Sequence, residues 1–294
     1  MSRVMKGSII VLSLLIIGLI ISQGTVFAKA TKAEVTGIVD FSIVTNKYAQ
    51  LFLDGGGSIE TNCKFLSLIN SSGELIVLTN KGEFKTKFLV NCGGLYCDRI
   101  AKLCAVNPGL QIVPFRGEYY KLKKEKEYLV NNLIYPVPDP RFPFLGVHFT
   151  RIMKGGVEAG PNAVLAFKRE GYRKKDFSFA DISKMISYLG FWKMASKYYK
   201  MGFGEFYRSF RRKAFVKALQ KLVPEVQLND IAKGGTVVRA QALEPNGNLV
   251  DDFRIVEAER MIHVLNAPSP AATASISIGN TIAKMVKKKY DEEI

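Results

Sequence analysis

Four closely spaced prolines constrain the fold of this chain more than any other feature: Pro136, Pro138, Pro140 and Pro143. Each proline fixes φ and removes a backbone donor, so residues 135–143 can form neither a helix nor a central strand. The next residues, 144–150, alternate as a strand does, and Lys154-Gly155-Gly156 indicates a turn. Residues 157–159 are predicted to form the return strand, which Gly160-Pro161 ends.

This hairpin predicts that His148, on the first strand, lies near Asn162, just after the second. A rigid segment beside an ionisable strand residue is one way to build the wall of a binding site. An edge hairpin that carries a histidine by chance fits the same spacing equally well.

The chain is strongly basic, with 42 Lys and Arg against 26 Asp and Glu and a net charge of +16. Such an excess favours an anionic partner: a carboxylate or phosphate ligand, a membrane surface or nucleic acid. No zinc-finger, basic-zipper or RNP motif is present, so we expect no nucleic-acid partner. The charge gathers between Lys168 and Lys221, in a region predicted to form helices broken at Gly190 and at residues 202–204. The basic side of these helices faces either solvent or an anionic membrane.

An uncharged, largely aliphatic run covers residues 7–28 and follows Arg3 and Lys6. A basic start, an apolar run and small residues at its end are typical of a secretory signal peptide. The whole run is also long enough for an N-terminal hydrophobic helix that anchors the chain, and a core element of a soluble fold is the remaining alternative. We therefore assign residues 1–35 to a signal-like or anchor segment. The protein is expected to be membrane-associated if this segment acts as such, and cytoplasmic otherwise.

The cysteine pattern predicts no metal site. None of the four cysteines, at positions 63, 92, 97 and 104, forms a Cys-x-x-Cys pair, and neither histidine lies at metal spacing from them. Free, partly buried thiols are expected. A disulfide between Cys97 and Cys104 would require export.

Residues 40–101, before the prolines, are predicted to form a helix, a three-stranded meander and a glycine turn that leads from a strand into a helix. Asp40 is a candidate N-cap for a helix that the three glycines at 55–57 end. Residues 65–69, 74–79 and 84–90 predict three antiparallel strands. An apolar strand then runs into Gly93-Gly94, and a helix is predicted to begin near Tyr96. Two glycines at a strand-to-helix turn let a ligand approach the backbone, and the helix N-terminus favours anions.

The segment 88–101, Phe-Leu-Val-Asn-Cys-Gly-Gly-Leu-Tyr-Cys-Asp-Arg-Ile-Ala, resembles a segment of flavoproteins of the D-amino-acid-oxidase-like superfamily. Residues 112–120, 135–172 and 263–274 narrow the resemblance to the L-2-hydroxyglutarate dehydrogenase (oxidase) family, over residues 36–286. The resemblance implies FAD as cofactor and an α/β fold. A partial Rossmann-like FAD-binding domain would comprise residues 36–108 and 232–294. An antiparallel-sheet substrate domain with helices would comprise residues 109–231.

Members of this family begin with a strand, a glycine loop and a helix that hold the FAD pyrophosphate, and nothing of that kind precedes Thr36. We therefore expect a truncated form that does not bind FAD tightly alone, with a partner chain as a possible source of the missing half. The alternative is a non-enzymatic remnant, membrane-anchored or exported, that does not hold FAD.

Oxidation of L-2-hydroxyglutarate to 2-oxoglutarate needs a base, a hydride acceptor and cations for the carboxylates. His148 is the candidate base, since an imidazole titrates near neutrality, whereas His263 is expected to be a core residue. The candidate substrate residues are Arg116, Asn162, Arg239 and Gln241. A structural ion pair is the alternative for either arginine, and Lys168 and Arg169 are expected to be solvated. The resemblance places these residues beside the flavin: Gly93, Gly94, Asn266, Pro268, Ser269, Ala271 and Thr273.

Overall fold

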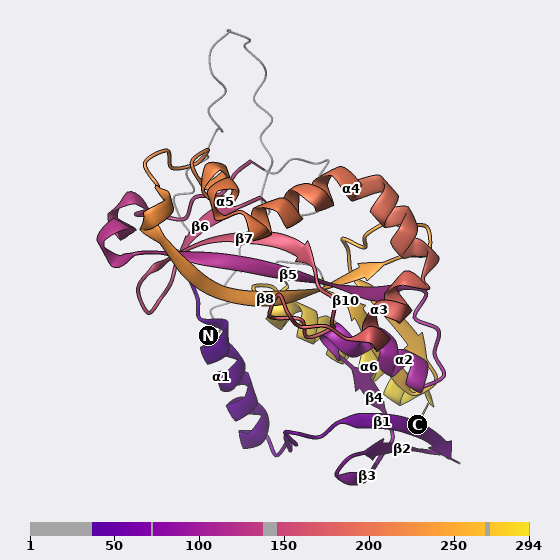
Figure 1. Ribbon diagram of the computed structural model, residues 1–294. Helices are drawn as coiled ribbons and strands as arrows, with labels where there is room; N and C mark the ends of the chain where they lie inside the picture. The colour runs from indigo at the N-terminus through magenta and orange to yellow at the C-terminus, as the bar shows by residue number, and fades with distance from the viewer. Residues whose placement is uncertain (1–36, 72, 138–145, 268–270, 294) are drawn as a thin grey trace, which may run out of the picture.

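The computed structural model describes residues 37–71, 73–137, 146–267 and 271–293 (Figure 1). Three sheets organise this part of the chain, in the strand orders β1-β2-β3, β4-β10-β9 and β6-β7-β5-β8. Within the described ranges, no helix has the length and apolar character to cross a membrane. The predicted N-terminal hydrophobic helix lies outside them.

The first elements confirm the predictions made from local signals. Helix α1 (Phe41–Asp54) begins after Asp40, whose carboxylate accepts a hydrogen bond from the Ser42 amide at 2.9 Å. Strands β1 (Phe65–Ser71), β2 (Glu74–Thr79) and β3 (Gly82–Thr86) form the expected antiparallel meander. The third predicted strand, 84–90, is wrong in extent, because the chain leaves the meander after Thr86 and enters a second sheet.

That second sheet carries the predicted flavin-domain segments. Strand β4 (Leu89–Asn91) runs parallel to β10 (Met261–Asn266), which pairs antiparallel with β9 (Arg254–Ala258). A 3₁₀ turn, η1 (Gly94–Tyr96), leads from β4 into helix α2 (Cys97–Leu103), as the sequence predicts. Cys97 and Ala101 of α2 pack on Leu265 in one buried cluster.

The largest sheet contains β5 (Gln111–Leu122), β6 (His148–Arg151), β7 (Val157–Leu165) and β8 (Ile231–Leu243). The prediction that Gly160-Pro161 ends the return strand is wrong. Strand β7 continues to Leu165, and its pairing with β5 shifts register at Glu118/Tyr120, which accommodates the proline at an irregular point. Because β8 pairs with β5 as far as Leu243, this sheet includes residues assigned above to the flavin domain. The domain division itself stays a prediction.

Helices cover parts of this sheet, namely η2 (Lys124–Leu129), α3 (Phe179–Ile186), α4 (Leu189–Phe210), α5 (Arg212–Leu219) and η3 (Leu228–Asp230), and α6 (Ser275–Glu293) follows β10. The predicted break near Gly190 is confirmed, since α4 begins there. The predicted break at residues 202–204 is wrong: both glycines lie inside α4.

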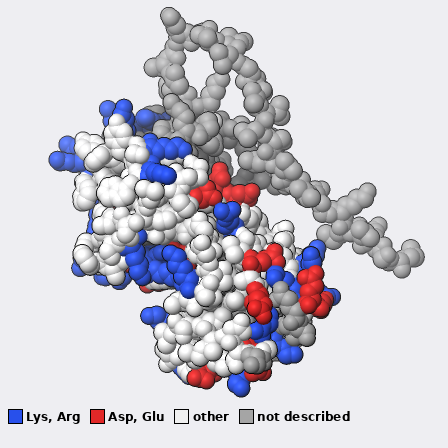
Figure 2. Space-filling model, turned by 90° about the vertical axis from the view of Figure 1, so that its right-hand side faces the viewer, with Lys and Arg blue, Asp and Glu red and all other residues white. Residues whose placement is uncertain are grey.

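The basic side chains are not gathered in one belt. In the view of Figure 2, Lys and Arg form separate patches with uncharged surface between them. All four cysteines, at positions 63, 92, 97 and 104, are free. No cluster of His, Cys, Asp and Glu suited to a metal occurs among the described residues.

Candidate functional site

The two segments expected beside a flavin meet at one edge of the second sheet. Strands β4 and β10 are parallel, and His263 pairs with Asn91 in their ladder. The turn at Gly93-Gly94 follows β4, and residues 266–273 follow β10, so both leave the sheet at its carboxyl edge. Ligands of open α/β sheets bind at this edge.

The described residues at this edge fit one side of a flat cofactor. Gly94 has φ of +52° and open space where a Cβ would stand. Asn266 is buried and donates to the carbonyls of Val250 and Asp252, which fixes the end of β10. The small residues Ala271 and Thr273 stand beyond it, and Pro268 and Ser269 lie outside the described residues. The cofactor assignments of all these residues stay predictions.

Asn91 and His263 support this edge from inside. The Asn91 amide donates to the Cys97 carbonyl at 2.8 Å and lies 3.0 Å from His263 Nδ1, and its oxygen accepts from the Gly93 amide. Because this amide nitrogen is a donor, Nδ1 of His263 accepts and the proton sits on Nε2. His263 is fully buried, and its Nε2 has no hydrogen-bond partner in the described structure. The expected core position is confirmed, although its hydrogen bonding is only half complete.

Two predicted substrate residues, Arg116 and Asn162, lie in an internal polar network. Arg116 is buried and donates twice to Glu118, at 3.0 and 2.9 Å, and to the carbonyl of Arg173. Asn162 pairs with Glu118 in the sheet and donates to the carbonyl of Glu205 in α4. Both side chains are engaged by the protein itself. Contact of either with a substrate stays a prediction.

Arg239 and Gln241 lie on the opposite face of the same sheet. Side chains directly paired across a ladder share a face, and successive residues alternate. Arg239 pairs with Phe115, next to Arg116 in β5, and therefore points away from the Arg116 network. Arg239 is exposed, and desolvation lowers the pKa of its guanidinium. Gln241 is buried and donates to the Val250 carbonyl.

His148 lies on β6, the edge strand of the large sheet opposite β8. It pairs with Gly160, two residues from Asn162, so the predicted proximity along the strands is confirmed. The ring stacks on Tyr135 with centroids 4.4 Å apart, and Nδ1 lies 3.1 Å from the Gly146 carbonyl. A carbonyl only accepts, so Nδ1 carries the proton and Nε2 keeps a free lone pair. Desolvation lowers the pKa of His148, which favours this neutral form.

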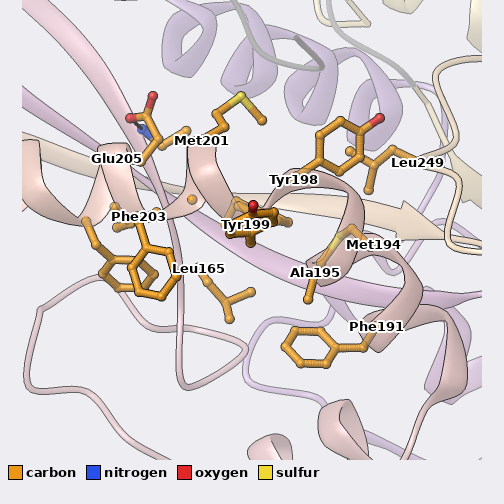
Figure 3. A pocket seen from close by; sticks show the side chains of 15 residues that line it. Leu165, Phe191, Met194, Ala195, Tyr198, Tyr199, Met201, Phe203, Glu205 and Leu249 are labelled. Atoms are coloured by element: carbon orange, nitrogen blue, oxygen red, sulfur yellow. Dashed lines mark hydrogen bonds between the residues drawn. The ribbon is translucent and has the colours of Figure 1, made fainter. Parts of the chain in front are cut away.

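Helix α4 covers an apolar cavity of about 230 Å³ beside the last residues of β7 (Figure 3). Aromatic and methionine side chains of the helix line it together with Phe115 and Leu165. Glu205 is the acidic residue at its wall, and burial raises the pKa of that carboxyl. None of the predicted site residues lines this cavity.

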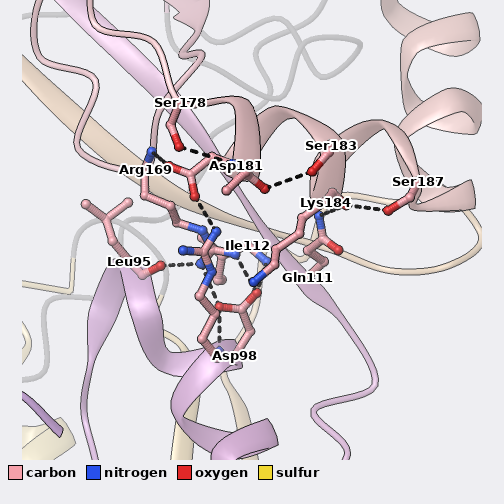
Figure 4. Close-up of polar contacts among 12 residues, drawn as sticks. Leu95, Asp98, Gln111, Ile112, Arg169, Ser178, Asp181, Ser183, Lys184 and Ser187 are labelled. Carbon is pink, nitrogen blue, oxygen red and sulfur yellow. Dashed lines mark hydrogen bonds and ion pairs between the residues drawn. The ribbon is translucent and has the colours of Figure 1, made fainter. Parts of the chain in front are cut away.

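Two ion pairs that the sequence did not predict join α2 to the segment between β7 and α3 and to α3 itself (Figure 4). Asp98 binds Arg169, with Nη1–Oδ1 at 2.6 Å and Nη2–Oδ2 at 2.8 Å, and Arg99 binds Asp181 at 2.5 Å. The prediction that Arg169 is solvated is wrong, since the residue is buried. The adjacent Asp98 and Arg99 were a visible signal, but nothing in the sequence identified their partners, which lie 71 and 82 positions away.

Known proteins resemble this chain in both sequence and structure. The chain is 55% identical over 256 residues to L-2-hydroxyglutarate dehydrogenase of Indibacter alkaliphilus, a match that covers 87% of this chain and 64% of that protein. It is 47% identical over 274 residues to the human mitochondrial L-2-hydroxyglutarate dehydrogenase, covering 87% and 59%. The chain thus spans about three fifths of the length of these curated relatives.

Solved structures show the same fold at low sequence identity. The FAD-bound L-alpha-glycerophosphate oxidase of Mycoplasma pneumoniae superposes with a TM-score of 0.60 at 19% identity, covering 81% of this chain and 54% of that one. Glycine oxidase of Bacillus cereus gives 0.54 at 12% identity, covering 84% and 56%. The sequence also matches the family described as "DAO: FAD dependent oxidoreductase" over residues 23–285. The resemblance inferred from the sequence is therefore confirmed, and the chain belongs to the FAD-dependent oxidoreductase family.

Proposed function

We propose that the protein is an FAD-dependent oxidoreductase that oxidises L-2-hydroxyglutarate to 2-oxoglutarate. The observation that carries this proposal is the 55% identity to an L-2-hydroxyglutarate dehydrogenase over most of the chain. The parallel β4–β10 edge supports it, because Gly93-Gly94 and the segment after β10 meet there. FAD, when bound, supplies the acceptor for the hydride that leaves C2 of the substrate.

His148 is proposed as the base that takes the proton of the substrate hydroxyl. Its Nδ1–H is held by the Gly146 carbonyl, which leaves Nε2 to receive that proton. Stacking on Tyr135 fixes the ring plane. The lowered pKa keeps His148 unprotonated, and therefore basic, at neutral pH.

Arg239 is proposed to bind a substrate carboxylate, with Gln241 next to it on the same face. The planar guanidinium of an arginine can bind both oxygens of a carboxylate. Arg116 and Asn162 are proposed to support the substrate site, since Arg116 joins β5 to the segment after β7 and Asn162 joins β7 to α4. Their own polar groups already have protein partners.

The remaining contacts to FAD are proposed to come from outside the described residues, from this chain or from a partner chain. The second candidate function is a non-enzymatic module that does not hold FAD.

Anaerobic titration of the purified protein with L-2-hydroxyglutarate tests the proposal. Bleaching of a bound flavin by the L-enantiomer, with D-2-hydroxyglutarate and L-malate as controls, is the expected result. A colourless protein that stays colourless after incubation with FAD would favour the non-enzymatic candidate. A flavoprotein that the L-enantiomer does not reduce would reject the proposed substrate.

A further inference from the structure

We propose that Tyr119 is a further substrate-binding residue, whose phenol donates a hydrogen bond to the substrate carboxylate that Arg239 binds. Tyr119 lies in β5 and is not among the site residues predicted from the sequence. This role rests on the proposed function, because the ligand is the same substrate. It is indicated by the position of Tyr119 in the large sheet and by the residues that surround its ring.

The more exposed face of the large sheet carries both Arg239 and Tyr119. In β8, Gly235, Val237 and Arg239 are exposed and alternate with less exposed residues. Val237 pairs with Gly117 of β5, so Gly117 shares this face. Tyr119, two residues further along β5, follows on the same side. A phenol and a guanidinium therefore project from the same face of the sheet.

The ring of Tyr119 lies close to two glycines of this face. A Cβ added at Gly117 would stand 3.7 Å from Cε2 of Tyr119, and one at Gly160 would stand 3.0 Å from its Cδ1. Because Cε2 adjoins the carbon that bears the hydroxyl, the hydroxyl end of the ring leans toward Gly117. Arg239 pairs with Phe115, the next residue of β5 on this face beyond Gly117. The phenol is therefore directed toward the candidate carboxylate-binding arginine.

Tyr119 also lies near the candidate base. His148 pairs with Gly160, and residues paired directly across a ladder share a face. Gly160 separates His148 from Tyr119, since its missing side chain leaves room for the Tyr119 ring. The strand order β6-β7-β5-β8 then arranges His148, Tyr119 and Arg239 in a row across the sheet. A base, a hydroxyl donor and a cation in this order suit a molecule that carries a hydroxyl next to a carboxylate.

The surroundings of Tyr119 keep its phenol a hydrogen-bond donor. Desolvation by burial raises the pKa of Tyr119, and the nearby Glu158 and Tyr135 raise this pKa further. The phenol is therefore protonated at neutral pH and offers its O–H to an anion. Tyr135 also stacks on His148, which again places the tyrosines and the histidine together.

Glycine on the neighbouring strand leaves space for a ligand beside this ring. Gly117 and Gly160 make room for the Tyr119 ring itself, whereas a Cβ at Gly235 would meet nothing within 4 Å. Glycine inside a strand is unfavourable, and it often marks a place where a ligand approaches the backbone closely. The open space at Gly235 lies on β8, the strand of Arg239. A carboxylate there can reach both the phenol and the guanidinium.

The variant Tyr119→Phe tests this role, because it removes the hydroxyl and keeps the ring. The full chain is incubated with FAD, and the binding of 2-oxoglutarate is measured by calorimetric titration. The variant is expected to bind about tenfold more weakly, since it loses a hydrogen bond to a charged carboxylate. Its thermal unfolding should match that of the parent, because the packing of the ring is retained.

The adjacent tyrosine supplies the matched control. The ring of Tyr120 lies 4.7 Å from that of Phe215 in α5, on the other side of β5, so Tyr120→Phe should keep the parental affinity. A double variant, Tyr119→Phe with Arg239→Met, tests whether both residues bind one carboxylate. It should bind less weakly than the product of the two single effects predicts, because the two contacts depend on each other.

The outcomes separate this role from the proposed function. Equal affinity of Tyr119→Phe and the parent would overturn the role of Tyr119 and leave the proposed function standing. Equal losses in Tyr119→Phe and Tyr120→Phe would also overturn it, since the effect would then belong to β5 as a whole. Fully independent losses in the double variant would show that Tyr119 and Arg239 do not share a carboxylate. A parent protein that binds no 2-oxoglutarate in the presence of FAD would reject the proposed substrate together with this contact.

Discussion

Asp98 and Arg169 form a bidentate ion pair inside the protein, with side chains that are 2% and 5% exposed. Asp98 lies in α2, beside the Gly93-Gly94 turn, and Arg169 follows β7 of the large sheet. The same carboxylate accepts from the Ile112 amide at 3.0 Å, and Arg169 also donates to the Leu95 carbonyl. One buried pair thus fixes α2, which follows β4 at the carboxyl edge of the β4–β10 sheet, relative to the sheet that carries the proposed substrate residues.

Removing either member of this pair is expected to destabilise the fold by about 3–5 kcal/mol, because the other charge remains buried without a partner. Asp98→Asn and Arg169→Met are the variants, and urea unfolding is the measurement. The double variant should lose less than the sum of the two. As control, Lys81→Met removes the exposed pair with Glu60 and should cost about 0–1 kcal/mol. Additive losses at Asp98 and Arg169 would show that the two residues act independently.

The two candidate substrate arginines are expected to behave differently. Arg239→Met should weaken 2-oxoglutarate binding by about 2 kcal/mol, roughly 30-fold, because it removes a charge-assisted contact to a carboxylate. Arg116→Met should lower stability by about 1–3 kcal/mol, since Glu118 then loses two charge-assisted hydrogen bonds and keeps Lys174, at 3.5 Å, as its remaining cation. Calorimetric titration of the flavin-loaded protein and urea unfolding separate the two effects. Equal affinity of the Arg239 variant and the parent would remove Arg239 from the site.

Local signals predicted the fold well where the chain itself decides the structure. The Asp40 cap, the meander turns and the turn from β4 to α2 each depend on a few neighbouring residues. Residues 84–90 contain neither glycine nor proline, so no local turn signal marks the passage from one sheet to the next. Pro161 continues β7 because a register shift accommodates it, and Gly202 stays helical because tertiary packing of α4 outweighs its low propensity.

The site was less predictable, because partners distant in sequence decide it. Arg116 is engaged by Glu118 and by carbonyls near residue 173, and Arg169 by a carboxylate 71 positions away. Residue type indicated that these arginines would bind carboxylates. Whether the carboxylate belongs to the protein or to a substrate depends on the sheet register, which separates Arg116 and Arg239 onto opposite faces.

His148 predicts a shifted pH profile. The base must be neutral in the free enzyme, and desolvation lowers the pKa of His148 below its ordinary value of about 6.5. The ratio kcat/KM should therefore stay constant as pH falls to the ordinary histidine pKa of about 6.5, and it should decline only at lower pH. His148→Gln should lower kcat by about 100-fold or more and remove that decline. An unchanged acid limb in the variant would assign the base to another residue.

Two glycines of α4 predict opposite effects on stability. A Cβ at Gly190 would stand 2.3 Å from the Glu244 carbonyl oxygen, so Gly190→Ala should cost roughly 1–3 kcal/mol. A Cβ at Gly202 meets nothing within 4 Å, and Gly202→Ala should stabilise the helix by about 0.5–1 kcal/mol. Thermal unfolding of both variants checks the pair. A loss at Gly202 would indicate that this segment of α4 needs the flexibility of glycine.

His263 should make the folded state sensitive to acid. Burial lowers its folded-state pKa, so the unfolded chain binds the proton more readily. Stability from this residue is therefore fully present above the unfolded pKa of about 6.5 and is lost as pH falls toward the folded pKa. His263→Gln keeps an acceptor for the Asn91 amide and cannot be protonated, so it should unfold with a weaker pH dependence between about pH 7 and 5. Urea unfolding of parent and variant across that range measures the difference, and identical slopes would show that His263 does not titrate on unfolding.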